Sequence, residues 1–371
     1  MYGSDRCLYE LVKRIDKTRF IPVIVLPFKG VLADRLRALG VTVYITDPWV
    51  LRKGVFRSIK LIPYLLRLPV SLFRLVRIIR KEDISVVYSN TSVIIAAALA
   101  AFITRRPHIF HIREVYDDYP NISHYYNLFL CLLSKKIIAI SKTVATIVTT
   151  RCVQKVNIIY DGIALDRFNT ITSQCPDIIS VLKQQNFVVV SNIGRISPMK
   201  GQELFISAVE KCLQHNKSLR FLIIGGVFHG NEPYLMRLQD MINKKDLKDI
   251  ITFTGFRDDV DNFILNSDIL VLSTIISEPL GQIVMEGMAA GKVFIAPDRG
   301  GPGELIEHGT DGILYMSGNS DALAQSLLRV ANDPELRKSM GKKARLKAEK
   351  KFGIQSNIHS IERIIKEAAS D

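Results

Sequence analysis

Short apolar runs rich in β-branched residues alternate with helical patterns along the whole chain. Parallel strands need a crossover helix between them, so this alternation is typical of doubly wound parallel sheets. Such sheets bind their ligands at the carboxyl ends of the strands. The sequence therefore predicts an α/β protein with two Rossmann-like doubly wound domains that face each other across a cleft. The predicted strands are 21–26, 41–46, 84–88, 108–112, 136–140 and 156–160 in the first half, and 187–193, 220–224, 250–254, 269–273, 293–296 and 312–315 in the second.

Two domains also fit a length of 371 residues, at about 100–200 residues per domain. A cluster of Ser, Gln, Cys and Pro at 170–185 separates the two sets of strands and predicts a linker. We assign residues 1–172 to the first domain and 173–353 to the second. A C-terminal helix, 354–371, is expected to pack back on the first domain.

The chain opens unusually for such a fold. Residues 1–5 resemble the turn that normally follows the first strand, and a helix is predicted directly afterwards at 6–15. The first strand, which is central in a doubly wound sheet, is therefore missing from the predicted first domain. We expect the natural protein to carry about 15 further N-terminal residues that form it.

Composition argues against several classes of protein. The five Cys residues are scattered without a CxxC pair, which argues against a disulfide framework or a zinc site and favours a reducing cytosol. No stretch reaches the roughly 18 apolar residues of a membrane span. The net charge of +14 favours an anionic partner, which is nucleic acid, phospholipid or a phosphorylated substrate.

Much of the positive charge lies in residues 52–81, which hold nine Lys or Arg and no acidic residue. Their mixture with Leu, Ile, Val and Phe predicts one or two amphipathic helices, broken near Pro63 and Pro69. Such helices either form a solvated basic surface or bind to the surface of an anionic membrane. Nucleic acid fits less well, because the segment has few aromatic residues and no recognised binding motif.

Glu278 and Glu286 frame the segment SEPLGQIVMEGMAAG. Pro279 disfavours helical geometry at Glu278 and suits the first helical position, so Glu278 should precede a helix and Glu286 should lie two turns inside it. At about 1.5 Å rise per residue, the two backbones lie roughly 12 Å apart. This distance is too long for a shared metal ion, but it matches the span from the sugar to the ribose of a nucleotide-diphosphate sugar. The diphosphate would then face the N–H groups at the start of the helix.

A basic loop from Gly194 to Gly201 follows the strand 187–193 and precedes a helix. It is not a Walker A loop, because Gly and not Ser or Thr follows Lys200. Arg195 and Lys200 lie at the carboxyl end of a strand, where two cations can neutralise a diphosphate. Alone, such a loop is typical of solvated surface; together with the two glutamates downstream it predicts a binding site.

Weaker candidates surround these segments. Residues 225–226 and 255–256 follow strands, and the loop 299–304 (RGGPGE) is rich in Gly; these glycines either let a ligand approach or are ordinary turns. His108 and His111 lie three apart on one strand, so at most one faces a cleft, and His111 is nearer the carboxyl end. A strand His is also commonly a structural residue. Further candidates for a general base are Glu114, Asp117 and Asp118.

In this order and spacing the motifs resemble glycosyltransferase family 4, a family of retaining sugar transferases with the GT-B fold of two Rossmann-like domains. The resemblance covers nearly the whole chain and is strongest from 189 to 352. Its main carriers are the E-x7-E pattern of Glu278 and Glu286 and the G-R…K-G element of 194–201. Further matches are IITFTGF, SDILVLST and GGPGELI, with weaker ones in HIREV, IAISK, IIYDGIALDRF and LRKSMGKKAR.

The resemblance implies a role for each matching residue. The second domain would bind the donor and the first the acceptor. Arg195 and Lys200 would hold the donor diphosphate, while Glu278 would contact the transferred sugar and Glu286 the ribose. The other implied donor-site residues are Gly3, Ser4, Gly194, Leu280, Gly281 and Gln282, with Gly255 and Phe256 at the base and His111 beside the sugar.

The implied activity is transfer of a hexosyl group, with retention, from a UDP- or GDP-sugar to a hydroxyl of a glycan or lipid-linked acceptor in surface polysaccharide synthesis. No metal or other cofactor is expected. The enzyme would be cytoplasmic, with residues 52–81 on the inner face of the cell membrane. Two alternatives stay open. A GT-B nucleotide-sugar epimerase is disfavoured by the E-x7-E segment, and an inactive sugar-nucleotide-binding scaffold is favoured by the missing strand.

Overall fold

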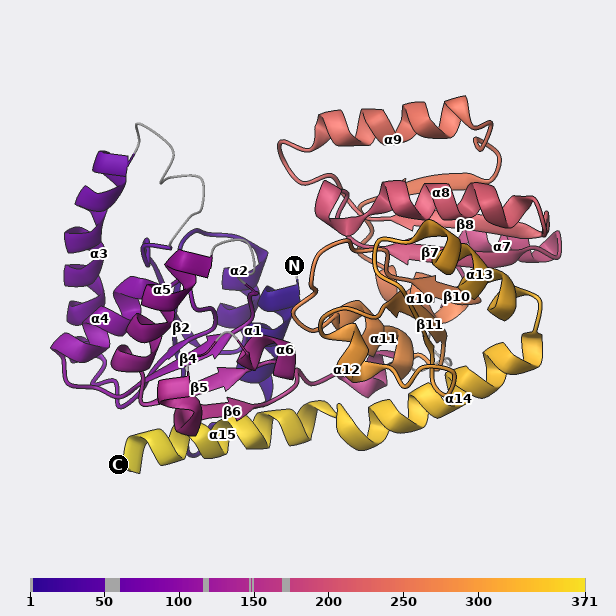
Figure 1. Ribbon diagram of the computed structural model, residues 1–371. Helices are drawn as coiled ribbons and strands as arrows, with labels where there is room; N and C mark the ends of the chain where they lie inside the picture. Colours follow the sequence, from indigo (N-terminus) through magenta and orange to yellow (C-terminus); the bar gives the residue numbers. More distant parts are fainter. Residues whose placement is uncertain are drawn as a thin grey trace. The chain divides into compact units, whose positions relative to one another are not determined.

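The computed structural model describes residues 3–50, 61–115, 120–146, 148, 150–168 and 174–370. The chain divides into two compact units, which we describe separately (Figure 1). The first unit holds Met1–Gly162 and Gln355–Asp371, and the second holds Ile163–Ile354. Every strand range predicted from the sequence overlaps an observed strand, so the predicted α/β architecture is confirmed.

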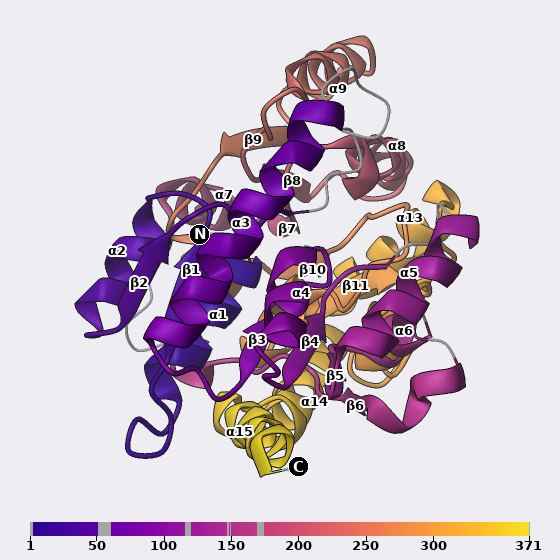
Figure 2. The ribbon, with the colours of Figure 1, turned by 90° about the vertical axis from the view of Figure 1, so that its left-hand side faces the viewer.

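The strands of the first unit form two separate parallel sheets (Figure 2). One sheet pairs β1 (Val23–Leu26) with β2 (Thr42–Ile45). The other has the order β3 (Val87–Ser89), β4 (His108–Ile112), β5 (Lys136–Ala139) and β6 (Val156–Ile158). The helices of this unit are α1 (Gly3–Arg14), α2 (Val31–Ala38), α3 (Leu61–Lys81), α4 (Ile95–Ile103), α5 (Pro120–Leu133), α6 (Lys142–Ala145), η2 (Thr150–Lys155) and α15 (Ile354–Ser370).

The two sheets of the first unit are not joined by hydrogen bonds between described strands. Within the described part of the chain, β1 pairs only with β2 and β3 pairs only with β4, so each keeps one unpaired edge. The sequence predicts a turn at residues 1–5, but the structure has α1 from Gly3 onward, so this prediction is wrong. Gly3 and Ser4 are exposed at its start.

The last helix, α15, belongs to the first unit. Glu362 accepts a hydrogen bond from the backbone N–H of Asp16, at 2.8 Å, and Glu367 forms an ion pair with Lys136 on β5, at 3.0 Å. The unit boundary lies at Gly162 and Ile163, because Ile163 exchanges backbone hydrogen bonds with Phe352 and Ile354 of the second unit. The predicted boundary at 172–173 lies outside the described residues, and the predicted linker 170–185 includes a helix from Asp177.

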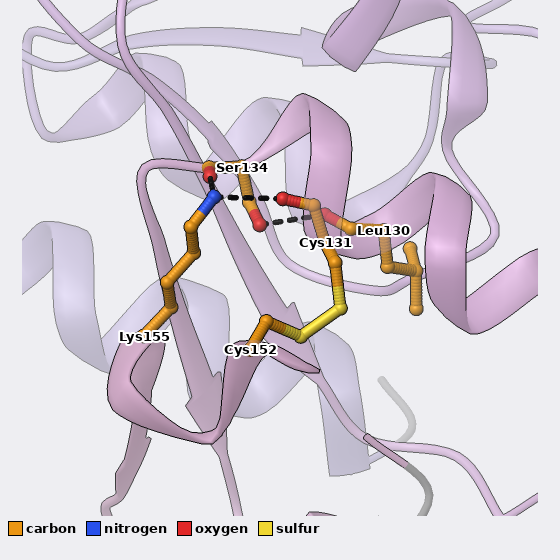
Figure 3. Close-up of a disulfide and its surroundings, with 5 residues drawn as sticks. All are labelled: Leu130, Cys131, Ser134, Cys152 and Lys155. Carbon is orange, nitrogen blue, oxygen red and sulfur yellow. Dashed lines mark hydrogen bonds between the residues drawn. A yellow bond between two sulfur atoms is a disulfide. The ribbon is translucent and has the colours of Figure 1, made fainter. Parts of the chain in front are cut away.

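A disulfide joins Cys131 on α5 to Cys152 on η2, with Cα atoms 5.8 Å apart (Figure 3). Lys155 binds the same region, because its Nζ donates to the carbonyl oxygens of Cys131 and Ser134, each at 2.8 Å. The sequence argued against a disulfide framework and did not predict this pair. The two Cys are 21 residues apart in no recognised motif, so only the fold brings them together.

The basic segment also differs from its prediction. Residues 52–60 lie outside the described residues, and the rest forms α3, which continues through Pro63 and Pro69. Beyond Pro69, the buried Leu75 and Ile79 pack with Ala96 and Ala100 of α4. No helix in the described ranges is long and apolar enough to span a membrane.

The second unit is built on one sheet of parallel strands, β7 (Val188–Ile193), β8 (Leu219–Ile224), β9 (Ile251–Gly255), β10 (Ile269–Val271), β11 (Val293–Pro297) and β12 (Ile313–Tyr315). Their order in space is β12-β11-β10-β7-β8-β9. The chain therefore winds outward in one direction from β7 and in the other from β10. This reversal is the topological switch point, where doubly wound sheets bind ligands.

Helices cover both faces of this sheet. Alternate residues of β10 point to opposite faces, as in any strand. Ile269 and Val271 join a core that includes Phe205 of α8, whereas Leu270 and Phe294 of β11 lie against α11. The helices of this unit are α7 (Asp177–Gln184), α8 (Gln202–Leu213), α9 (Glu232–Lys244), α10 (Val260–Asn266), α11 (Gln282–Ala289), α12 (Pro302–Leu305), α13 (Ser320–Ala331) and α14 (Pro334–Lys351), with short 3-10 helices η3 (Leu165–Phe168) and η5 (Pro198–Lys200).

Close packing of α14 against the end of α11 depends on a glycine. A Cβ at Gly341 would lie 2.1 Å from the carbonyl oxygen of Gly291, in the turn that follows α11. Arg345 of α14 also binds the end of α11, because its guanidinium donates a hydrogen bond to the carbonyl of Ala289. Since Gly291 contributes its backbone and not a flexible side chain, neither partner can move aside without shifting a helix.

We predict that Gly341→Ala destabilises the second unit, although Ala is favoured over Gly in a helix by about 1 kcal/mol. The steric conflict should lower the free energy of unfolding by about 1–3 kcal/mol, as overpacking does elsewhere. Urea denaturation checks this, with the neighbouring exposed Lys342→Ala as the control. Equal stability of the two variants would show that α14 does not pack this closely.

Candidate active site

The loops after β7 and β10 meet at the switch point through their backbones. Gly201 has φ 65°, and a Cβ there would lie 2.0 Å from the carbonyl oxygen of Ser273. The Ser273 hydroxyl donates to the carbonyl of Lys200 at 2.9 Å, and the Thr274 hydroxyl donates to that of Met199 at 2.9 Å. These contacts fix the backbone on both sides of Lys200, so the position of its side chain depends on the fold of both loops.

Lys200 and Glu278 form an ion pair at this edge of the sheet. Nζ lies 2.8 Å from Oε2, and both side chains are largely buried. The sequence places Lys200 at the diphosphate and Glu278 at the transferred sugar, which are adjacent groups of a donor. The structure brings the two residues together, while the roles of both stay predictions.

The loop after β11 supports the backbone of Glu278. Gly301 donates its N–H to the Glu278 carbonyl at 2.8 Å, and a Cβ at Gly301 would lie 2.3 Å from the Cα of Leu280. Gly300 has φ 78°, and a Cβ there would lie 2.6 Å from the carbonyl oxygen of Glu278. These two glycines of the RGGPGE loop therefore let two loops pack together.

Helix α11 begins later than the sequence predicts. Its first residue is Gln282, and Gly281 before it has φ 87°, a left-handed conformation that a continuing helix does not allow. Pro279 therefore lies before the helix and not at its first position, and Glu286 lies one turn inside α11 and not two. Glu286 is buried, and so is Leu280.

A residue that the sequence did not single out binds Glu286. Arg167 on η3 lies with Nη1 and Nη2 each 3.4 Å from Oε1 of Glu286. The same guanidinium forms a bidentate pair with Asp261 on α10, at 2.6 Å and 3.1 Å. Burial would lower the pKa of Arg167, but the charges of Glu286 and Asp261 outweigh it and raise that pKa. The only sequence signal was the place of Arg167 in the weakly matching segment IIYDGIALDRF.

The loops after β7, β8 and β9 also meet. A Cβ at Gly225 would lie 2.0 Å from the carbonyl oxygen of Gly194, and Gly225 donates its N–H to the Gly255 carbonyl at 3.0 Å. The guanidinium of Arg195 lies 5.4 Å from the ring centre of Phe228, within the range of a cation–π contact. Phe256 is exposed beside these loops. The structure thus groups Gly194, Arg195, Gly255 and Phe256, whereas their predicted contacts with a donor stay predictions.

His111 is buried in the first unit, because all five residues of β4 are buried and its side chain is fully inaccessible. Its predicted place beside the donor sugar stays a prediction. Its Nδ1 contacts the Tyr88 hydroxyl, and its Nε2 has no hydrogen-bond partner among the described residues. Burial, and after it the charge of Arg113, keep the pKa of His111 well below its usual value. In this structure His111 is a buried residue of the first unit.

The other first-unit candidates are in structural contacts or outside the described residues. The Glu114 carboxylate accepts hydrogen bonds from the N–H and hydroxyl of Ser92 and from the Thr91 hydroxyl. Asp117 and Asp118 lie outside the described residues. Ser4 accepts a hydrogen bond from the Asn90 amide at 3.3 Å through its carbonyl. Among the residues with described positions, no group of three or more His, Cys, Asp or Glu could hold a metal ion.

Two family models match consecutive parts of the chain. Glycosyltransferase Family 4 matches residues 2–167, and Glycosyl transferases group 1 matches residues 177–347. Among curated proteins, the putative glycosyltransferase YtcC of Bacillus subtilis is 34% identical over 170 residues, which are 44% of this chain and 41% of that protein. The α-D-kanosaminyltransferase of Streptomyces kanamyceticus is 30% identical over 158 residues, 42% of this chain and 39% of that protein. The chain thus matches about two fifths of the length of these relatives.

Solved structures match over nearly the whole chain. Alr3699/HepE of Anabaena, solved in complex with UDP-glucose, has a TM-score of 0.82 at 22% identity and covers 99% of this chain and 96% of that one. A glycosyltransferase from Rickettsia africae ESF-5 has a TM-score of 0.81 at 21% identity, over 99% and 95% of the two chains. At this identity the likeness shows the fold alone, which is GT-B.

We predict that acid destabilises the protein through the buried His108 and His111. Burial lowers the pKa of His108 to about 3, and that of His111 is also lowered, so the folded state keeps both neutral while the unfolded state binds protons near pH 6.5. Their contribution to the free energy of unfolding is complete above about pH 6.5. It is lost as the pH falls toward the pKa values of the two histidines in the folded state. Between pH 6.5 and pH 5, His108→Gln should lose roughly 2 kcal/mol less unfolding free energy than the unchanged protein. Urea denaturation at several pH values measures this, and the exposed His229→Gln should follow the unchanged protein.

Proposed function

Because the chain belongs to glycosyltransferase family 4, we propose that it transfers a sugar from a nucleotide-diphosphate sugar to a hydroxyl group. The observation that carries the proposal is the pairing of Lys200 with Glu278 at the switch point, directly before the N-terminus of α11. A cation at the start of a helix suits a diphosphate, and an adjacent carboxylate suits sugar hydroxyls. UDP is the nucleotide in the similar Alr3699/HepE structures, so a UDP-sugar is the first donor to test.

The proposed reaction breaks the bond between the anomeric carbon and the leaving diphosphate oxygen, and the acceptor oxygen bonds to the same carbon on the same face. The transition state is oxocarbenium-like, and negative charge grows on the departing phosphate. Lys200 and Arg195 would stabilise that charge, and the phosphate would take the acceptor proton. We propose that no metal is required and that a hexosyl group is transferred with retention.

The proposed acceptor is a glycan or a lipid-linked glycan in surface polysaccharide synthesis. Support comes from the names of relatives, which include a lipopolysaccharide core biosynthesis glycosyltransferase of Rhizobium meliloti. The test is incubation with UDP- or GDP-sugars, first alone and then with acceptors. Transfer to acceptor with release of the nucleoside diphosphate supports the proposal. A new nucleotide sugar formed from donor alone would identify an epimerase instead, and binding without turnover over a broad acceptor panel would indicate a scaffold.

We predict that Lys200→Ala lowers turnover at least about a hundredfold, because loss of one group that stabilises transition-state charge typically costs about 2.7–4 kcal/mol. Nucleoside diphosphate release with a working donor measures the rate. Lys211→Ala is the matched control, since Lys211 forms an ion pair of similar length with Asp321 but lies on α8 away from the switch point. A folded Lys200→Ala enzyme with the turnover of the control would remove Lys200 from the active site.

We further propose that α3 binds an anionic membrane surface. Leu66, Val70 and Phe73 share one helical face and are 69%, 50% and 68% exposed, which is unusual for large apolar side chains. Arg74 and Arg77 are exposed beside them, and α3 has no acidic residue. An apolar stripe flanked by arginines is typical of helices that lie in the headgroup region of anionic lipid.

The membrane proposal predicts sedimentation with vesicles that contain anionic lipid, and weaker sedimentation with neutral vesicles. Each basic residue near such a surface contributes about 1 kcal/mol, so Arg74→Ser with Arg77→Ser should lower the partition coefficient roughly 30-fold at low salt. Lys342→Ser with Lys343→Ser removes the same charge from an exposed face of α14 and serves as the control. Equal binding to both kinds of vesicle, or equal loss in both variants, would count against α3 as the contact.

A further inference from the structure

Arg167 holds together three segments that are far apart in the sequence. It lies on η3, while its partners Asp261 and Glu286 lie 94 and 119 residues later on α10 and α11. We propose that Arg167 is a positioning residue that orients the Glu286 carboxylate for the ribose hydroxyls of the donor. The inference rests on the proposed function, because it assumes a nucleotide donor at Glu286.

Asp261 fixes the plane of the guanidinium. Two parallel hydrogen bonds, from Nε to Oδ2 at 3.1 Å and from Nη2 to Oδ1 at 2.6 Å, prevent rotation about the end of the side chain. The ring of Phe168, 5.0 Å from Cζ, lies on one side of the group. With the guanidinium held in this way, Nη1 and Nη2 both face one oxygen of Glu286 at 3.4 Å.

The charges favour a hydroxyl ligand over an anionic one. Glu286 has a side chain that is only 8% exposed, and a buried carboxylate stays ionised only with a compensating partner. Arg167 compensates it, but it also compensates Asp261, so the three groups together carry one negative charge. A net negative cluster repels a phosphate and accepts hydrogen bonds from neutral donors. A vicinal diol such as the ribose 2′- and 3′-hydroxyls meets this requirement.

The fixed guanidinium sets the direction in which the Glu286 carboxylate accepts hydrogen bonds. Without Arg167, the Glu286 carboxylate would lose the two N–H donors that face its Oε1, so the guanidinium would no longer fix its orientation. The acceptor would then no longer lie in a defined place. Binding of the nucleotide would weaken through the ribose, whereas contacts with the base and the diphosphate would be unchanged.

The test compares UDP with 2′,3′-dideoxy-UDP by isothermal titration. A hydrogen bond to a charged group contributes enough for the unchanged protein to prefer UDP by about 10- to 100-fold. In Arg167→Met the preference should fall below about threefold through loss of UDP affinity, while dideoxy-UDP binds as before. Glu286→Gln should lose the same preference, and the double variant should lose no more, because both residues act on one interaction. In turnover, Arg167→Met should raise the donor KM more than it lowers kcat.

Controls separate this role from a merely structural one. Arg237→Met removes an exposed arginine that forms an ion pair with Glu203 at 3.0 Å, and it should keep the full preference for UDP. Should Arg167→Met fail to fold, Asp261→Asn keeps the arginine and loosens its orientation, and it should lower the preference partially. A folded Arg167→Met protein that retains the preference, while Glu286→Gln loses it, overturns the inference and leaves the proposed function intact. An unchanged protein that binds neither UDP nor GDP overturns both.

Discussion

Backbone-to-backbone contact at the switch point is the constraint on which the candidate site depends. Gly201 lies against the carbonyl of Ser273, and Gly301 lies against Leu280, each too closely for a Cβ. Because main-chain atoms make these contacts, the loops after β7, β10 and β11 hold one another at fixed distances. The ion pair of Lys200 with Glu278 follows from this arrangement and is not its cause. Loss of one of these glycines would therefore displace the charged groups without removing any of them.

The sequence predicted the strands because their signal is local. The strands of the second unit are short apolar runs, and alternate residues face opposite helical layers, as Ile269 and Leu270 do on β10. The same local reasoning identified the Gly194 loop and the glutamates around α11. It misplaced the start of α11, since the preference of Pro279 for a first helical position was overridden by the left-handed conformation of Gly281.

Other features depend on contacts between distant segments, and no local pattern shows them. Arg167 meets its carboxylates only after η3, α10 and α11 have packed together, and Cys131 meets Cys152 only after α5 has packed on η2. His111 was correctly placed on a strand, but alternation says only that at most one of His108 and His111 faces a cleft. All five residues of β4 are buried, which the local pattern did not show.

The distribution of charge indicates why the proposed site would bind a whole donor more tightly than any one part of it. In the proposed donor site, Lys200 and Arg195 would supply cations at the middle, whereas Glu278 and the Glu286–Arg167 cluster would supply acceptors at the two ends. Free phosphate would meet only the cations, and a nucleoside would meet only the cluster. Each charge-assisted hydrogen bond contributes about 1.5–3 kcal/mol, too little for tight binding alone. In the proposed site a nucleotide-diphosphate sugar would engage all three regions at once, so selectivity would arise from their spacing and not from the strength of any one contact.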